Sequence, residues 1–289
     1  MATDPTLFMP DFKEQPFWWD AAPRPALPER PLPAKVDVAV VGSGHTGLVA
    51  ALTLARAGRS VAVFDAGDAG QGASSRNAGY VGRSLKHSFG EILERHGPER
   101  AVAVYRDMRA AFDWVFTLVE QEQIACKLVR CGRFIGARSP RQYEAMAREY
   151  ELRRHHLGEP FDMVTRTDQQ RELGSDYYCG GAIIPDHGSF HPGLYHLGLL
   201  DRATSAGVEI HARTPVTDIR RNGDDFIVAT DRGGVAARDV LVATNGYVDQ
   251  ALPWFRRRVV PFHGYIVATE PLAREHIDRI LPHARTVIE

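Results

Sequence analysis

The chain has 289 residues, of which 44% are hydrophobic and 25% are charged, and its formal net charge is -1 at pH 7. These values are typical of a globular protein with one large or two ordinary domains. The near-neutral charge excludes a global field that would attract nucleic acid or an anionic membrane, so we expect neither as a partner.

The cysteines and the N-terminal residues bear on the compartment. Cys126, Cys131 and Cys179 are an odd number of thiols without the CxxC spacing of a zinc site, so we expect reduced thiols and no metal centre. The first residues lack the basic and apolar regions of a signal peptide, and no apolar run approaches the roughly 20 residues needed to cross a bilayer. We therefore expect a cytoplasmic protein without a transmembrane segment.

Residues 1–34 are predicted to form an N-terminal arm in front of the first domain. The segment is rich in proline, which favours extended backbone, and it carries Phe17, Trp18 and Trp19. Large aromatic rings can anchor such a segment. We expect the arm to pack on the body of the chain itself, with binding of a partner as the alternative.

Residues 35–65 are predicted to be a strand, a tight turn, a helix and a second strand that ends at Asp65. The turn carries Gly42, Gly44 and Gly47 in the spacing GxGxxG. These glycines would tighten the turn, admit a pyrophosphate against backbone N–H groups, and bring helix and strand together. The helix N-terminus adds the positive end of its dipole, and Asp65 lies where an acid binds an adenosine ribose. The segment therefore predicts a dinucleotide site.

A second loop, residues 72–79, follows the second strand directly and is rich in small, hydrogen-bonding residues. Ser74 and Asn77 offer a hydroxyl and an amide, Arg76 offers a guanidinium for phosphate charge, and glycines such as Gly79 permit close backbone approach. Beside the first motif, this loop supplies what the far half of a dinucleotide needs.

The rest of the chain alternates helical and strand-like patterns, which indicates an α/β fold. The predicted helices cover residues 97–123, 140–156 between an N-cap at Ser139 and a stop at Gly158, 167–174 with a capping box at Thr167, and 192–206. The predicted strands cover residues 208–210, 226–229 and 240–242, with a turn at 221–225 inside an inserted β-meander near 212–238. The last strand runs into a small-residue turn at 243–246, as expected where a strand end meets a cofactor.

With these three pieces in this order, the chain resembles the FAD-dependent D-amino-acid oxidase superfamily, which includes glycine and sarcosine oxidases. The aromatic, proline-rich lead-in, the stretch GASSRNAG at 72–79 and the turn ATNGY at 243–247 are most similar to the gamma-glutamylputrescine oxidoreductase subgroup. The resemblance extends from about Phe17 onward and includes FHP at 190–192 and PFHGY at 261–265.

The resemblance implies a Rossmann-like FAD-binding domain of the GR2 type with an interleaved α+β substrate domain. The expected FAD-binding domain is discontinuous and covers residues 35–85 and 188–250. The expected substrate domain covers 86–187 and 251–289, and it is incomplete because the superfamily continues through a substantial C-terminal portion.

The resemblance also implies FAD bound in an extended form, with residue roles at matching positions. Gly42, Gly44 and Gly47 would meet the pyrophosphate and Asp65 the adenosine ribose. Ser74, Arg76, Asn77 and Gly79 would approach the pyrophosphate and the flavin side. Val216 would meet the adenine, and Ala243, Thr244, Asn245 and Gly246 the backbone of the cofactor.

Three positions depart from the common pattern of the superfamily. Ser75 and Ala78 stand where glycine is common, so we expect a stiffer loop that keeps its donors. Asp65 replaces the commoner glutamate and reaches less far toward the ribose.

The chemistry that the resemblance implies is oxidation of the C–N bond of a small amine or amino acid. A hydride passes to the flavin, water hydrolyses the imine, and oxygen or another electron acceptor reoxidises the cofactor. Two alternatives stay open: a truncated, non-catalytic remnant, and an NAD-dependent dehydrogenase, because the first glycine motif alone does not distinguish FAD from NAD.

The sequence assigns no catalytic residue. His263 and Tyr265, on a predicted strand of the substrate domain, are candidates to line the substrate pocket, with packing as the alternative. His45, inside the glycine turn, is expected to face solvent, with a place facing the flavin or the phosphate as the alternative. His187, His191 and His196 are expected to have structural roles rather than to bind metal, because Pro192 interrupts any common helix.

Overall fold

The structure, a computed structural model, describes residues 13, 15–248, 251–260, 262 and 264–289. The chain divides into two compact units. Unit 1 comprises Met1–Ala78 with Pro192–Ile266, and unit 2 comprises Gly79–His191 with Val267–Glu289. Both units combine helices with sheet, so the predicted α/β class is confirmed.

Unit 1 is built on a six-stranded sheet with the order β8-β2-β1-β11-β10-β9. Its parallel part consists of β1 (Lys35–Val41), β2 (Val61–Phe64), β8 (Glu209–His211) and β11 (Gly233–Val242). The antiparallel extension is the predicted meander, formed by β9 (Val216–Asn222) and β10 (Asp225–Thr230). This order places β1 between β2 and β11, with all three carboxyl ends at one edge.

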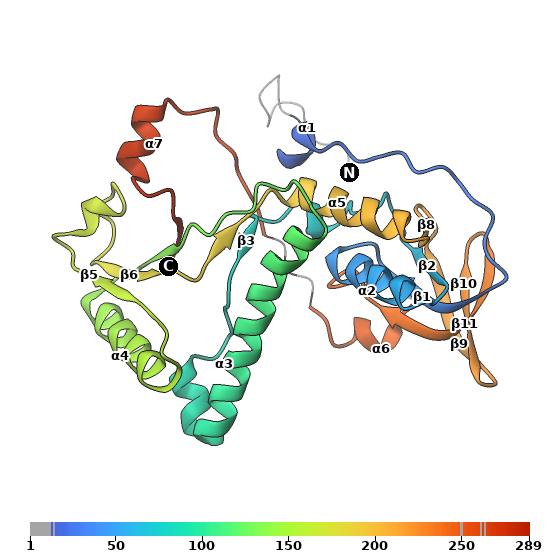
Figure 1. The fold of residues 1–289 in the computed structure, drawn as a ribbon, viewed down its shortest axis with the longest axis horizontal. Coiled ribbons are helices and arrows are strands. Elements are labelled where there is room, and N and C mark those ends of the chain that lie inside the picture. Colours follow the sequence, from blue (N-terminus) through green and yellow to red (C-terminus); the bar gives the residue numbers. More distant parts are fainter. Residues whose placement is uncertain (1–12, 14, 249–250, 261, 263) are drawn as a thin grey trace. The chain divides into compact units, whose positions relative to one another are not determined.

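Two long helices belong to unit 1 and pack against each other (Figure 1). Helix α2 (His45–Arg56) connects β1 to β2 and buries Leu48 and Leu52, four residues apart on one face. Helix α5 (Pro192–Ser205) leads into β8. The shorter elements of the unit are α1 (Trp18–Ala21), the 3-10 turn η1 (Ala73–Ser75) and α6 (Pro253–Arg256).

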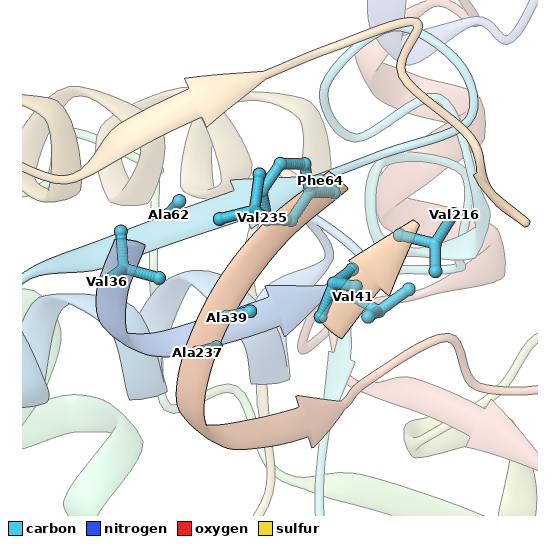
Figure 2. Close-up of a cluster of buried hydrophobic side chains, with 9 residues drawn as sticks. Val36, Ala39, Val41, Ala62, Phe64, Val216, Val235 and Ala237 are labelled. Carbon is cyan, nitrogen blue, oxygen red and sulfur yellow. The ribbon is translucent and has the colours of Figure 1, made fainter. Parts of the chain in front are cut away.

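The core of unit 1 lies on the sheet, where strands from distant parts of the sequence contribute to one apolar layer (Figure 2). Its buried members are Val36, Ala39, Val41, Ala62, Phe64, Val216, Val228, Val235 and Ala237. Strand β1 is buried along most of its length, as a parallel strand covered on both faces should be.

Strand β11 links the meander to the parallel sheet. Its first half pairs antiparallel with β10, and its second half pairs parallel with β1, from Ala236 opposite Lys35 to Val242 opposite Val41. The strand curves strongly at Ala237 (Figure 2). It therefore delivers the turn at 243–246 directly beside the end of β1.

Unit 2 contains a four-stranded sheet and a two-stranded ribbon. The larger sheet has the order β12-β4-β6-β5, with β12 (Thr286–Ile288), β4 (Arg133–Gly136), β6 (Gly181–Ile184) and β5 (Asp162–Val164). The ribbon pairs β3 (Tyr80–Val81) with β7 (Gly188–Ser189). The helical elements are α3 (Phe89–Gln121), α4 (Pro140–Leu157), the 3-10 turn η2 (Gln169–Arg171) and α7 (Arg274–Ile280).

The helix ends test the sequence patterns. Helix α4 has both predicted ends: the Ser139 hydroxyl accepts a hydrogen bond from the Gln142 nitrogen, and Gly158 adopts the left-handed conformation. Helix α3 begins at Phe89 rather than near Gly97, because the capping box of Ser88 starts it earlier. Gly97, with φ of 79°, instead breaks the helix internally.

The capping box predicted at Thr167 is wrong. The hydroxyl of Thr167 lies 2.8 Å from that of Thr165, and it is Thr165 that accepts a hydrogen bond from the Asp168 nitrogen. Only the 3-10 turn η2 forms there, from Gln169 to Arg171. Among the described residues, no helix combines the length and the apolar character that a membrane span requires.

Candidate functional site

The turn after β1 requires glycine at three positions for three different reasons. Gly42 has a φ of 105°, and a Cβ there would lie 2.7 Å from the carbonyl oxygen of Ala243. A Cβ on Gly47 would lie 1.9 Å from the carbonyl oxygen of Gly42, so the helix could not approach the strand. A Cβ on Gly44 would lie 2.8 Å from the Ser74 hydroxyl, so a side chain there would displace Ser74.

Helix α2 begins at this turn with its N-terminus toward the second loop. Gly44 is the N-cap and provides no side-chain cap. The main-chain nitrogen of His45 donates to the Ser74 hydroxyl at 3.0 Å. The positive end of the helix dipole and the hydroxyl of the second loop are therefore brought together.

Asp65 lies at the end of β2 and ties the glycine turn to the loop that follows. Its carboxylate accepts from the nitrogen and the hydroxyl of Ser43, at 2.8 and 2.5 Å, and from the Gly67 nitrogen at 3.1 Å. The Ser43 hydroxyl in turn accepts from the Gly70 nitrogen at 3.1 Å. The carboxylate therefore holds the glycine turn and the segment after β2 together.

These elements surround a cavity of about 350 Å³ in unit 1. Most of the residues predicted to bind the cofactor line it: Gly42, Gly44, Asp65, Ser74, Arg76, Val216, Ala243, Thr244 and Asn245. The strand ends converge there because Gly42 donates to the carbonyl oxygen of Phe64, and Ala243 to that of Val41, each at 2.8 Å. The cavity therefore lies at the carboxyl edge of the parallel strands, where α/β sheets bind ligands.

The other predicted residues lie elsewhere. Gly47 packs beneath the turn, and Gly246 is not among the residues that line the cavity. The Asn77 amide donates within its own loop, to the carbonyl oxygens of Ala73 and Ser74. Gly79 belongs to unit 2, where its carbonyl oxygen accepts from the Phe190 nitrogen.

Sequence reasoning missed several residues that line the cavity. They are Val41, Phe64, Ala66, Gly67, Gly70, Gln71, Gly72, Ala73, Tyr247, Ala251 and Leu252. The glycines among them were the usable signal, because glycine permits close approach of the backbone. The structure shows such an approach at Gly70, where a Cβ would lie within 2.5 Å of the His196 ring. The apolar members carry no pattern that separates them from ordinary core or loop residues.

The expectation that His45 faces solvent is wrong. Its ring packs edge-on against Tyr195 at 4.9 Å and lies 6.3 Å from His196, both on α5. Burial lowers the pKa of His45 to about 4, so the ring is neutral at pH 7.

His196 is completely buried and supports the glycine turn. One ring nitrogen, Nδ1, lies 2.9 Å from the Arg24 guanidinium, and Nε2 lies 2.8 Å from the carbonyl oxygen of Ser43. An arginine can only donate, so Nδ1 accepts and Nε2 carries the hydrogen donated to Ser43. Burial lowers the pKa of His196 to about 4, which agrees with this neutral form.

None of His187, His191 and Tyr265 is among the residues that line this cavity. His187 and His191 are buried in unit 2, and the described residues contain no group of three or more His, Cys, Asp or Glu able to hold a metal ion. Tyr265 is 91% exposed and does not line the cavity. His263 lies outside the described residues.

The comparisons with known proteins agree with the motifs. The family described as "DAO: FAD dependent oxidoreductase" matches residues 37–288. The probable oxidoreductase OrdL of Haemophilus influenzae is 29% identical over 258 residues, which cover 88% of this chain and 60% of that protein. The gamma-glutamylputrescine oxidoreductase of Escherichia coli is 29% identical over 247 residues, 85% of this chain and 58% of that protein.

A solved structure gives the same result. The glycine oxidase of Geobacillus kaustophilus is similar with a TM-score of 0.65 and 26% identity, over 76% of this chain and 58% of that one. The chain thus spans about three fifths of the length of these relatives. Because the family match covers most of the chain, the resemblance is confirmed: the chain belongs to the DAO family of FAD-dependent oxidoreductases.

Proposed function

We propose that this chain provides the FAD-binding part of an oxidoreductase that oxidises the C–N bond of a small amine or amino acid. Unit 1 would be the FAD-binding domain and unit 2 part of the substrate domain. The observation that carries the proposal is the convergence of the glycine turn, Asp65, the second loop and the turn at 243–245 on one cavity. Relatives named gamma-glutamylputrescine oxidoreductase and glycine oxidase support the substrate class.

The residues around the cavity fit FAD. The missing side chain at Gly44 leaves space over the N-terminus of α2 for a pyrophosphate, with Ser74 beside it. Asp65 presents a carboxylate to ribose hydroxyls, and Val216 presents an apolar surface to the adenine. Arg76 adds a cation on the same cavity.

When bound, FAD would supply the acceptor for the hydride that leaves the carbon of the C–N bond. The residues of this chain would bind and orient it, and none is assigned to proton transfer. Water would hydrolyse the imine product, and oxygen or another electron acceptor would complete the cycle. A cytoplasmic location is supported by the three free cysteines.

Binding of FAD to the purified chain is the experiment that tests this proposal. The chain is titrated with FAD and, separately, with NAD, and the dissociation constants are compared with those of a Gly44→Val variant. We expect FAD to bind, NAD to bind far more weakly, and the variant to lose FAD binding, because its side chain fills the space over the turn. Binding of NAD in preference to FAD, or of neither, would overturn the proposal.

Reduction of the bound FAD by candidate amines is the second measurement, and the substrate class depends on it. Amine-dependent bleaching of the flavin absorbance is the expected result. FAD that binds without being reduced by any amine or amino acid would instead identify the non-catalytic remnant.

A further inference from the structure

The N-terminal arm reaches the second loop through both of its tryptophans. The Trp19 indole donates to the hydroxyl of Ser75 at 2.9 Å, and the Trp18 indole donates to the carbonyl oxygen of Asn77 at 2.9 Å. Each indole has one N–H, so each donor is used on this loop. The two contacts lie on either side of Arg76 in the sequence.

The bond from Trp19 continues into the body of the loop. The Ser75 hydroxyl is buried and donates to the carbonyl oxygen of Gly70 at 2.6 Å. Because that hydrogen is used on Gly70, the oxygen of Ser75 is left to accept from Trp19. These two hydrogen bonds, from Trp19 to Ser75 and from Ser75 to Gly70, therefore hold both ends of the segment 70–75, most of which lines the cavity.

Trp19 also holds the cation of the loop. The Arg76 guanidinium lies over the Trp19 ring, 4.8 Å from its centroid, and its Nε donates to the carbonyl oxygen of Gln71 at 2.6 Å. A guanidinium over an indole face is attracted by the ring quadrupole. Trp19 thus orients Arg76, which lines the cavity, although Trp19 itself does not line it.

A second contact of the arm reaches the glycine turn through His196. Arg24 donates to the carbonyl oxygens of Ala22 and Gly193 and to Nδ1 of His196, whose Nε2 donates to Ser43. These partners are two carbonyl groups and a neutral imidazole, so none of them carries a negative charge. Arg24 therefore places a cation beside His196, and through the neutral ring of His196 it helps to fix the carbonyl group of Ser43.

We propose that residues 16–24 position the cofactor site: they hold the second loop and the glycine turn in the arrangement that FAD requires. This inference rests on the proposed function. The loop from Gly70 to Asn77 is rich in glycine and small residues, and without the arm its ordering would cost free energy at the moment of binding. Trp18, Trp19 and Arg24 are positioning residues, since they act through Ser75, Arg76 and Ser43.

The test compares two variants that separate the ring of Trp19 from its N–H. Trp19→Phe keeps an aromatic face for Arg76 and deletes the bond to Ser75, and Ser75→Ala deletes the acceptor. Trp19→Phe is expected to raise the FAD dissociation constant about 3- to 10-fold, the range expected for one hydrogen bond. Ser75→Ala is expected to raise it at least as much, because it also removes the bond from Ser75 to Gly70. The double variant is expected to bind FAD no more weakly than Ser75→Ala alone, because Ser75→Ala already removes the only bond that Trp19→Phe deletes.

The matched control is Trp114→Phe. Trp114 is a half-exposed residue of α3 in unit 2, so the same substitution there should leave the FAD dissociation constant unchanged. Unfolding midpoints without FAD are measured for all variants. The loss of FAD-binding free energy in Trp19→Phe should exceed the loss of unfolding free energy of the cofactor-free protein. Trp19→Phe is conservative enough to keep the chain folded.

Three results overturn the inference while leaving the proposed function in place. They are unchanged FAD affinity in Trp19→Phe, additive losses in the double variant, and equal losses in the Trp114→Phe control. Failure of the unaltered chain to bind FAD is a separate outcome, because it removes the proposed function itself.

Discussion

The carboxylate of Asp65 accepts two hydrogen bonds from Ser43, one from the main-chain nitrogen at 2.8 Å and one from the hydroxyl at 2.5 Å. The acid that the sequence pattern assigns to a ribose therefore also fixes the glycine turn to the end of β2. These two roles of Asp65 can be separated by mutation. Binding of the ribose depends on the charge of Asp65, whereas the link to the glycine turn depends also on the hydroxyl of Ser43.

Asp65→Asn is expected to raise the FAD dissociation constant about 10-fold or more, because it replaces charge-assisted hydrogen bonds to the ribose with neutral ones. Ser43→Ala removes the hydroxyl that donates to Asp65 and accepts from Gly70 but keeps the Asp65 carboxylate, so it should change FAD affinity less than about threefold. FAD titrations and urea unfolding of both variants measure the two roles. Equal losses of FAD affinity would mean that Asp65 acts only on the structure of the turn.

Gly47→Ala should destabilise unit 1 by about 3 kcal/mol or more. Its Cβ would lie 1.9 Å from the Gly42 carbonyl oxygen and would push helix α2 away from the end of strand β1. The matched control is Gly246→Ala, where nothing lies within 4 Å of the added carbon. Chemical denaturation without cofactor compares them. A Gly47→Ala variant as stable as the control would show that α2 can shift without cost.

Stability should fall when the pH is lowered, because buried neutral histidines must take up protons on unfolding. Burial holds the pKa of His45 and of His196 at about 4, against an ordinary value of 6.5. The unfolded chain binds protons below about 6.5 while the folded chain does not. The stabilising contribution is therefore complete above pH 6.5 and is lost progressively as the pH falls toward 4.

His196→Gln should flatten this dependence, as followed by urea midpoints between pH 7 and pH 4.5. The amide of glutamine can still donate toward Ser43, so the variant removes the titration more than the contact. His87→Gln, which replaces a half-exposed histidine, is the control and should keep the slope of the unaltered chain. If the urea midpoint of His196→Gln fell with pH as steeply as that of the unaltered chain, protonation of His196 would not be a cause of the loss of stability.

In unit 2, Glu159→Gln should cost about 3 kcal/mol, because Glu159 pairs with both Arg83 and Arg153 and all three side chains are at most 10% exposed. The substitution would leave Arg153 facing a neutral amide, and Arg83 with Asp186, at 3.5 Å, in place of its ion pair with Glu159. Glu144→Gln, in an exposed pair with Arg148 on α4, should change stability by less than about 1 kcal/mol. Thermal unfolding of both variants checks the difference.

The parts of the site that the sequence predicted are local in sequence. The three glycines and Asp65 fall within one βαβ segment, where spacing alone decides which groups meet. The start of α3 was misplaced because Gly97 and Pro98 look like a helix boundary, whereas the capping box at Ser88 lies upstream.

The contacts that escaped prediction join residues far apart in the sequence. Arg24 meets His196 across 172 residues, and His196 meets Ser43 across 153. No periodicity or spacing relates such positions, since only the packing of α5 beside the glycine turn brings them together. The same holds for Trp19 and Ser75, which the fold brings within one hydrogen bond.

The double pairing of β11 makes some insertions harmless and others damaging. An extra residue in the hairpin at Asn222 and Gly223 would change only the tip of the meander. One extra residue after Ala237 would shift the partners of β1 by one place and turn the following side chains to the opposite face. We therefore expect homologous chains to vary in length at the hairpin and to keep a constant number of residues from Ala237 to Ala243.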